Sequence, residues 1–379
     1  MTVRLYGRDV GHGSLAVVTR GFKQVLESAG LLEGFVAIDR SGGSEEDESP
    51  PGAQARDAVF TGNLNMVRVM LKRAKHLRHW VTVTPNSTHV PRELLAEVLT
   101  LASPRILSAS TWGTTVIFDA LKEMGCEHEP PEPDQPWLTF KYEGTDSTKR
   151  FEVHTVRHGV SGFAPVAEEI AKTRADFDRG EFRVVHFSTT DGERKGTLEL
   201  VQAWSKLRRD LPEQARLLLV LDHTARTALL ERLLSKGMRL PDRVSLLPRG
   251  DMDPVMMSKL LCHFHVLASP SRGEGFGLSP LEARASGVPI VTTDVTGHSA
   301  GHCVGPGAHL IRRSYDLAPI DDGPAAVAPI VHPSDIAEAL HYVYVNWKAF
   351  SYTASYHAAG IAEEWSWDKQ LAPLVGHLR

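Results

Sequence analysis

Two glutamates, Glu274 and Glu282, flank a stretch whose residue types suit the binding of a phosphate group. Glycine recurs at every second position of residues 273–277, so the backbone can pass close to another group there. The following residues predict a short helix that has Ser279 as its N-cap. The unpaired N–H groups at the start of such a helix attract an anion. The stretch is therefore expected to bind phosphate.

The two carboxylates call for separate explanations. Glu274 lies in the predicted loop, where a carboxylate near a phosphate is costly unless it accepts hydrogen bonds from hydroxyls. Two hydroxyls of a sugar would satisfy it. Glu282 stands three residues after Ser279, so it can bond the backbone N–H of Ser279 in a capping box and need no ligand. At this point Glu282 is open to either role.

The residues from Pro270 to Val291 follow the pattern P-S-x-x-E-G-F-G-L-x-x-L-E-A-x-A-x-G-x-P-I-V. This pattern resembles the signature of family-four retaining glycosyltransferases, which have two Rossmann-like domains (the GT-B type). The resemblance implies that Glu274 holds the transferred sugar and Glu282 holds the ribose. It further implies that the diphosphate binds the residues between them, namely Gly275, Phe276, Gly277, Leu278 and Ser279.

A second segment of the same resemblance supplies positive charge. Lys195-Gly196 matches the family's K-G pair, in which the lysine neutralises the diphosphate. The family places an arginine about five residues earlier, where this chain has Thr190, so Thr190 is expected beside the donor. Two alternatives are open for Arg194: it replaces the missing arginine, or it is only a neighbour of Lys195 in the sequence. His298 follows a predicted strand end and is expected to line the donor pocket.

Neither a metal nor a cofactor is expected from the remaining sequence. Asp251 and Asp253 form a D-x-D pattern, but Asp253 directly precedes Pro254 and is interpreted as the N-cap of a helix. Three scattered cysteines lack the spacing of a zinc site or a disulfide framework. Chemistry would come from positioning the acceptor and from stabilising the departing nucleotide diphosphate. The resemblance implies retention of the anomeric configuration.

Strands that alternate with helices must position these residues, and this alternation predicts a parallel α/β architecture. The first half has expected strands at 3–7, 35–39, 58–62, 80–84 and 105–109, with helices at 15–29, 64–76, 91–101 and 112–124. The second half has expected strands at 183–187, 216–221, 244–247, 262–268 and 288–292, with helices at 197–209, 224–236, 254–260 and 334–345.

The resemblance implies the GT-B fold, with two Rossmann-like domains facing a central cleft. The expected N-terminal acceptor domain comprises residues 1–157 together with a C-terminal helix at about 352–379, and the donor domain comprises residues 158–351. The resemblance implies that the loop after the first strand meets acceptor and donor, so Gly11, His12 and Gly13 are expected acceptor contacts, with a tight turn and an exposed His12 as the alternative. Ligands gather at the carboxyl ends of parallel strands, so Asn86 and His89, which follow another strand, are candidate acceptor contacts, although His89 could also be a solvated loop residue.

Composition restricts the partners and the location. A net charge of −4 gives no general electrostatic case for nucleic acid or membrane. No apolar run reaches the length of a membrane span, and the cysteine usage suits a reducing compartment, so a cytoplasmic protein is expected. The favoured acceptor is a small molecule or a glycan with a free hydroxyl.

Three further functions remain open. Basic residues crowd the predicted helix at 64–76 and the residues after it, and Arg68, Lys72, Lys75 and His79 would share a face of that helix. Such a face could hold a polyanionic acceptor such as DNA with a hydroxylated base, although a solvated basic surface is favoured. A sugar phosphorylase or epimerase of the same fold is a second candidate, and a non-catalytic scaffold that binds sugar nucleotides is a third. The intact Glu274 and Lys195 argue against the scaffold.

Overall fold

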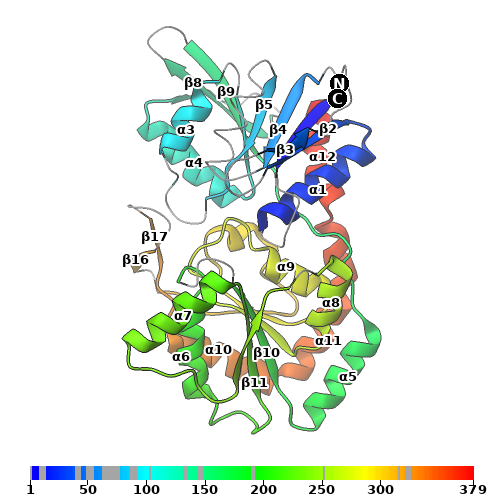
Figure 1. Ribbon diagram of the computed structural model, residues 1–379, viewed down its shortest axis with the longest axis vertical. Coiled ribbons are helices and arrows are strands. Elements are labelled where there is room, and N and C mark those ends of the chain that lie inside the picture. Colours follow the sequence, from blue (N-terminus) through cyan, green and yellow to red (C-terminus); the bar gives the residue numbers. More distant parts are fainter. Residues whose placement is uncertain are drawn as a thin grey trace. The chain divides into compact units, whose positions relative to one another are not determined.

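The protein is described by a computed structural model that divides into two compact units (Figure 1). Unit 1 comprises Met1–Gly159 and Ser366–Arg379, and unit 2 comprises Val160–Trp365. The structure describes residues 2–7, 14–38, 44–47, 55–61, 77–85, 90, 92–101, 104–130, 135–143, 148–188, 193–250, 252–314, 316–320 and 326–379.

Unit 1 contains a mixed sheet in the order β3-β2-β1-β4-β5-β6-β9-β8-β7. The central strands are parallel, and β8 runs antiparallel to β9 at one side of the sheet. The strands are β1 (Val3–Gly7), β2 (Leu32–Ile38), β3 (Ser44–Asp47), β4 (Asp57–Thr61), β5 (Arg78–Thr82), β6 (Arg105–Ser108), β7 (Glu127–His128), β8 (Trp137–Glu143) and β9 (Thr148–Thr155). The helices are α1 (Ser14–Ser28), α3 (Arg92–Leu99), α4 (Thr111–Glu123) and α12 (Trp367–Leu378).

Unit 2 contains a parallel sheet in the order β12-β11-β10-β13-β14-β15. Its strands are β10 (Arg183–Ser188), β11 (Arg216–Leu221), β12 (Val244–Pro248), β13 (Val266–Ser269), β14 (Ile290–Thr292) and β15 (Ala308–Leu310). Its helices are α5 (Ala167–Asp178), α6 (Thr197–Leu207), α7 (His223–Ser235), α8 (Pro254–Cys262), α9 (Leu278–Ala285), α10 (Pro333–Val345) and α11 (Trp347–Glu364), and Thr296–Ala300 forms a short 3₁₀ helix. A separate hairpin pairs β16 (Leu317–Pro319) with β17 (Val327–Pro329).

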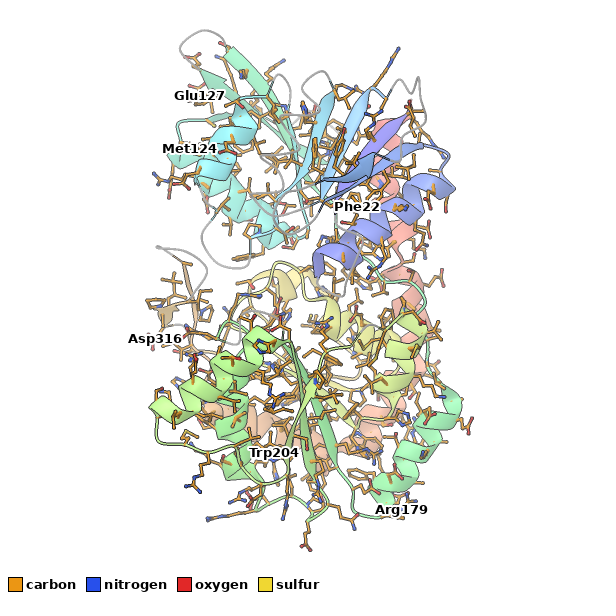
Figure 2. The ribbon with its side chains drawn as sticks, in the orientation of Figure 1. Phe22, Met124, Glu127, Arg179, Trp204 and Asp316 are labelled. Carbon is orange, nitrogen blue, oxygen red and sulfur yellow. The ribbon has the colours of Figure 1, made fainter. Side chains whose placement is uncertain are left out.

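Apolar side chains on both faces of the unit 2 sheet explain why this half folds as a doubly wound layer. Trp204 on α6 is fully buried among residues of β10, β11 and α10, and Figure 2 shows it deep within the unit. A second cluster covers the opposite face, where Val185 and Val220 meet α8 and α9. Strands buried on both faces are typical of a parallel sheet flanked by helices.

Most of the expected strands and helices are confirmed within a few residues, and so is the α/β architecture. The hairpin of β8 and β9 was not predicted. Apart from Trp137 its outward residues are polar, so residues 141–150 lack the apolar run that marked the other strands. The expected strand at 262–268 was too long, because Cys262 ends α8.

The C-terminal segment departs from the expected division. The sequence assigned residues 352–379 to the first domain, whereas only Ser366–Arg379 clusters with unit 1. Helix α11 belongs to unit 2 because it packs on α9, and the Arg174 guanidinium of α5 donates hydrogen bonds to Ser351 and Ser355 on α11. The first boundary was expected after residue 157, and the structure has it after Gly159.

Several sequence predictions fall outside the described residues. These are the acceptor contacts Gly11, His12, Gly13, Asn86 and His89, the donor contact Thr190, the D-x-D residue Asp251, and the helix at 64–76 with Arg68, Lys72 and Lys75. The prediction that His79 shares a helix face was wrong, because His79 lies buried in β5 and stacks against Phe60. In the part of the chain that is described, no helix has the length and apolar character needed to cross a membrane.

Candidate active site

The topology of unit 2 brings the two predicted donor segments together. Strands β10 and β13 are neighbours at the centre of the sheet, although β11 and β12 come between them in the sequence. The segment with Lys195 follows β10, and the segment with Glu274 follows β13. Because the order of the strands reverses between these two, their carboxyl ends form the crevice in which open α/β sheets bind ligands.

Glycine allows the two segments to touch. Gly196 has φ +67°, and a Cβ atom on it would lie 2.2 Å from the carbonyl oxygen of Pro270. The Arg272 backbone N–H also donates to the Arg194 carbonyl at 2.8 Å. Any other residue at position 196 would push the segment of Lys195 away from the segment of Glu274.

Helix α9 begins differently from the expectation. Ser279 lies inside the helix, and Gly277 is its N-cap with φ +101° and no side-chain cap. The capping-box prediction was therefore wrong, which removes the structural explanation for Glu282. A Cβ atom at position 277 would lie 2.3 Å from the His298 ring, so glycine is required both by φ and by space. The orphan amides of the first turn are those of Leu278 and Ser279, since Pro280 has none.

A second close approach fixes the loop that carries Glu274. A Cβ atom on Gly297 would lie 2.3 Å from the carbonyl carbon and oxygen of Gly275. The Gly297 N–H donates to the Glu274 carbonyl at 2.7 Å, and the Glu274 N–H donates to the Thr296 hydroxyl at 2.6 Å. The backbone of Glu274 is thus held from the 3₁₀ helix after β14.

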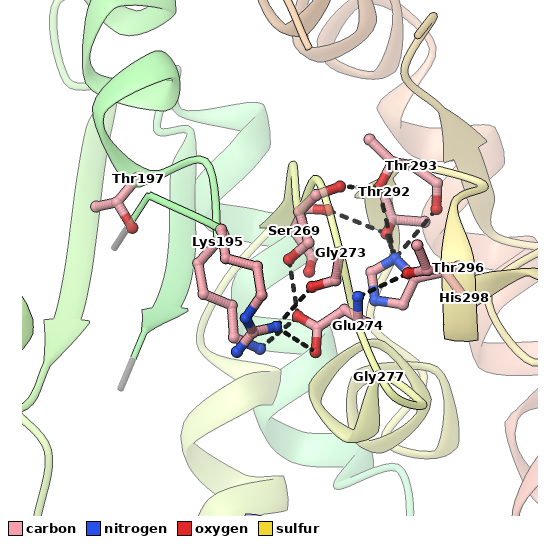
Figure 3. A network of polar contacts seen from close by, with 12 residues as sticks. Lys195, Thr197, Ser269, Gly273, Glu274, Gly277, Thr292, Thr293, Thr296 and His298 are labelled. Carbon is pink, nitrogen blue, oxygen red and sulfur yellow. Dashed lines mark hydrogen bonds and ion pairs between the residues drawn. The ribbon is translucent and has the colours of Figure 1, made fainter. Parts of the chain in front are cut away.

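The Glu274 carboxylate is buried and contacts two cations. Lys195 Nζ pairs with Oε1, and Arg194 Nη1 lies 3.3 Å from Oε2. The Ser271 hydroxyl donates to Oε1 at 2.8 Å. Figure 3 shows Lys195 and Glu274 pointing toward one another. Burial alone would raise the pKa of Glu274, but the charges of Lys195 and Arg194 outweigh it and hold the pKa well below its usual range.

Arg194 therefore shares in the charge of the site. Its Nη1 also donates to the Gly273 carbonyl at 2.5 Å, and its side chain is only 10% exposed. The sequence left open whether Arg194 merely neighbours Lys195. The structure brings both cations to the same carboxylate.

Glu282 is coupled to a cation that the sequence analysis missed. Burial raises the pKa of Glu282, while Arg249 and, more weakly, Lys195 lower it by their charge. Arg249 directly follows β12, and its backbone N–H donates to the Leu221 carbonyl at the end of β11. In the sequence, the one feature that could have indicated a role for Arg249 is its position directly after the end of an expected strand.

His298 is buried and neutral. Burial lowers its pKa to about 4. Its Nδ1 lies 3.1 Å from the Thr293 carbonyl, which can only accept, so the proton is on Nδ1 (Figure 3). Nε2 is then an acceptor, and it is buried without a hydrogen-bond partner among the described residues, beside Gly277. The structure thus places His298 next to the glycine loop.

Two residues of the motif have packing roles that the sequence does not reveal. Phe276 turns inward and stacks on His302 with ring centroids 4.0 Å apart, so its side chain is part of the core. Arg272 lies beside the glutamate in sequence but binds the β16–β17 hairpin, donating to the Pro329 carbonyl at 3.1 Å and the Ala318 carbonyl at 3.0 Å.

The cap interpretation of Asp253 is confirmed. Its carboxylate accepts from the Met256 N–H at 2.9 Å, and Pro254 opens helix α8. Within the described ranges, no group of histidine, cysteine, aspartate and glutamate has the arrangement of a metal site.

The comparisons with known proteins agree with this geometry. Residues 181–340 match the model of the family described as "Glycosyl transferases group 1". The fold is similar to trehalose-6-phosphate synthase OtsA (TM-score 0.68, 12% identity, 100% of this chain and 99% of that chain). It is also similar to sucrose-phosphate synthase of Thermosynechococcus elongatus (TM-score 0.65, 16%, 100% and 98%) and to Anabaena HepE in complex with UDP and glucose (TM-score 0.62, 14%, 100% of both chains). No curated protein matches the chain. Residues 181–340 thus match a group 1 glycosyltransferase domain, and the chain as a whole has the GT-B fold of these structures.

Proposed function

We propose that the protein transfers a sugar from a nucleotide-diphosphate sugar to a hydroxyl group of a small molecule or glycan, with retention of the anomeric configuration and without a metal. The observation that supports this best is the buried Glu274 carboxylate, which contacts Lys195 and Arg194 beside the first turn of α9. One carboxylate, two cations and a helix N-terminus are the groups that a sugar diphosphate requires.

In this proposal the cations act on the leaving group. Cleavage of the bond between the sugar and the diphosphate leaves negative charge on the phosphate oxygens. Lys195, Arg194 and the amides of Leu278 and Ser279 stabilise that charge. The proposed donor site thus supplies electrostatic stabilisation without a metal ion.

The remaining groups orient the donor. Glu274 accepts hydrogen bonds from sugar hydroxyls once the diphosphate draws Lys195 and Arg194 toward itself. His298 offers Nε2 as a further acceptor for a hydroxyl. Glu282 accepts hydrogen bonds from the ribose, and the charge of Arg249 offsets part of the rise in the pKa of Glu282 that burial causes. Positioning of this kind can supply a large part of the rate enhancement.

The test is turnover of purified protein with a panel of UDP-, GDP- and ADP-sugars, with UDP-glucose first because HepE was solved with UDP and glucose. Release of nucleoside diphosphate is measured without acceptor and with small-molecule and glycan acceptors. Glu274→Ala and Lys195→Ala should abolish the release, while Lys259→Ala, an exposed lysine of the same unit, should not alter it. Proton NMR of the product reads the anomeric configuration.

Several outcomes would contradict the proposal. Turnover that depends on orthophosphate would indicate a phosphorylase, and an epimerised nucleotide sugar would indicate an epimerase. Full activity of Glu274→Ala would show that the Glu274 carboxylate takes no part in the reaction. Loss of activity with EDTA that a divalent ion restores would refute metal independence.

A further inference from the structure

Unit 1 contains a cavity that the proposed transfer reaction does not use. It has a volume of about 690 Å³ and lies at the β8–β9 hairpin and the start of β6. Figure 1 shows β8 and β9 side by side at the edge of their sheet. The wall residues used below are Arg105, Glu129, Trp137, Thr139, Arg150 and Glu152.

Strand alternation explains why this face is polar. Phe140, Phe151 and Val153 belong to the core cluster that contains residues of α3 and α4. Successive side chains of a strand point to opposite faces, so Trp137, Thr139, Arg150 and Glu152 face the other way. Thr139 stands directly opposite Glu152 in the antiparallel pair. A sheet face that carries these residues is suited to a polar ligand.

The charges in the wall cancel in pairs. Arg105 Nε lies 3.0 Å from the Glu152 carboxylate, and Arg150 Nη2 lies 2.9 Å from the Glu129 carboxylate. Two cations and two carboxylates give the wall no net charge, so it does not favour an anion such as phosphate. The four charged groups still offer strong donors and acceptors to a neutral ligand that carries hydroxyls.

Two polar groups of the wall have hydrogen-bonding capacity that the described residues leave unused. Arg105 Nη1 is buried and has no hydrogen-bond partner among the described residues. The Thr139 hydroxyl accepts from Gln135 Nε2 at 2.7 Å, so its own hydrogen is available to donate. The Thr139 hydroxyl can therefore donate to a ligand oxygen.

An ordered aromatic ring completes the wall. Trp137 stacks on His154 with ring centroids 5.2 Å apart, and the His377 ring of α12 meets it edge-on at 4.3 Å. The indole is therefore held in place before any ligand arrives. A fixed aromatic surface beside paired carboxylates and arginines suits a sugar ring, which has one apolar face and a rim of hydroxyls.

We propose that this cavity is a binding site for a neutral oligosaccharide, separate from the donor site of unit 2. Its volume lies within the range of ligand pockets. All of its lining residues belong to unit 1, and none of them belongs to the site that contains Glu274. The site does not depend on the proposed transfer, so it should bind its ligand with or without a nucleotide sugar.

The experiment measures binding of neutral tri- to hexasaccharides with gluco, galacto, manno and N-acetylglucosamine units to the full chain, by calorimetry and saturation-transfer NMR. Trp137→Ala should weaken binding by about tenfold, or 1.4 kcal/mol. Thr139→Val should weaken it with little change in volume. Thr115→Val, at an exposed threonine of α4 outside the cavity wall, is the matched control for Thr139→Val and should bind like the wild type.

The donor-site variant Glu274→Ala separates this proposal from the proposed function. Oligosaccharide binding should persist in that variant even though transfer is lost. Binding that disappears in Glu274→Ala and survives in Trp137→Ala and Thr139→Val would overturn the proposal, and so would the absence of binding across the panel at millimolar concentration. Preference for inorganic phosphate or sulfated oligosaccharides over neutral ones would refute the ligand class. Thermal melting checks that each variant is folded.

Discussion

Replacing Glu274 by glutamine should affect stability as well as activity. The side chain keeps its shape but loses the charge that faces Lys195 and Arg194. The sequence analysis expected Glu274 in a loop, where sugar hydroxyls would satisfy its carboxylate. The structure instead buries Glu274, so its removal leaves a largely buried lysine without its counter-ion.

The magnitude follows from the cost of breaking a buried pair. Removing one partner of such a pair typically costs about 3–5 kcal/mol. We expect the lower end, about 3 kcal/mol, because Lys195 is 17% exposed and Arg194 keeps its bond to the Gly273 carbonyl. The pKa of Glu274 is lower in the folded state than in the unfolded state. Its contribution is therefore fully present above about pH 4.3 and is lost as the pH falls toward the folded value.

The assay is urea unfolding of the full chain, followed by tryptophan fluorescence, in a double-mutant cycle with Lys195→Met. The double variant removes both charges, so it should recover most of the lost stability while transfer remains absent. The difference between the wild type and Glu274→Gln should narrow below about pH 4.3. The reasoning fails if Glu274→Gln is as stable as the wild type at neutral pH, or if the double variant loses the sum of the two single losses.

Three further predictions concern other parts of unit 2. Burial lowers the pKa of His265 to about 3, so below about pH 6.5 the unfolded chain binds a proton that the folded chain does not. The free energy of unfolding therefore decreases as the pH is lowered. Replacing His265 by glutamine should remove about 2 kcal/mol of the decline between about pH 7 and 5, measured by urea unfolding, and an unchanged decline would refute this. Gly277→Ala should lower the stability of the protein and weaken nucleotide binding, because its φ is positive and a Cβ atom there would collide with the His298 ring. Gly360→Ala should do neither, because a Cβ atom at that position of α11 meets open space. Thermal melting measures the stability, and calorimetry measures nucleotide binding. Asp253→Ala should cost about 1 kcal/mol as a lost cap without changing turnover, and a loss of turnover would point to a ligand role.

The sequence was sufficient for most elements of unit 2 because their signals are local. Parallel strands buried on both faces are continuous apolar runs, and β11 was predicted with its observed bounds. The β8–β9 hairpin has a different physical origin. Only one face of the hairpin packs apolar residues such as Phe140 against the core, and the other face carries Arg150 and Glu152. The sequence of such a hairpin resembles a polar loop unless the pairing of the two strands is known.

The start of α9 shows where local rules compete. Serine, proline and glutamate at positions 279, 280 and 282 satisfy the capping box, yet the helix begins earlier. Gly277 adopts a left-handed conformation that other residues rarely adopt, and His298 and His302 pack against it from a segment about twenty residues away. A propensity for capping of about 1 kcal/mol does not outweigh that tertiary packing.

The roles of the three cations near Glu274 depend on the fold rather than on the motif. Arg272 is two residues from Glu274 and yet serves the β16–β17 hairpin, whereas Arg194 and Lys195 come from the other side of the crevice. Strand order makes this possible, because β10 and β13 are adjacent only through a crossover. Under the proposed function, the same two cations hold Glu274 ionised and neutralise the diphosphate. When the diphosphate draws the two cations toward itself, sugar hydroxyls replace them as donors to the Glu274 carboxylate, so its oxygens stay hydrogen-bonded.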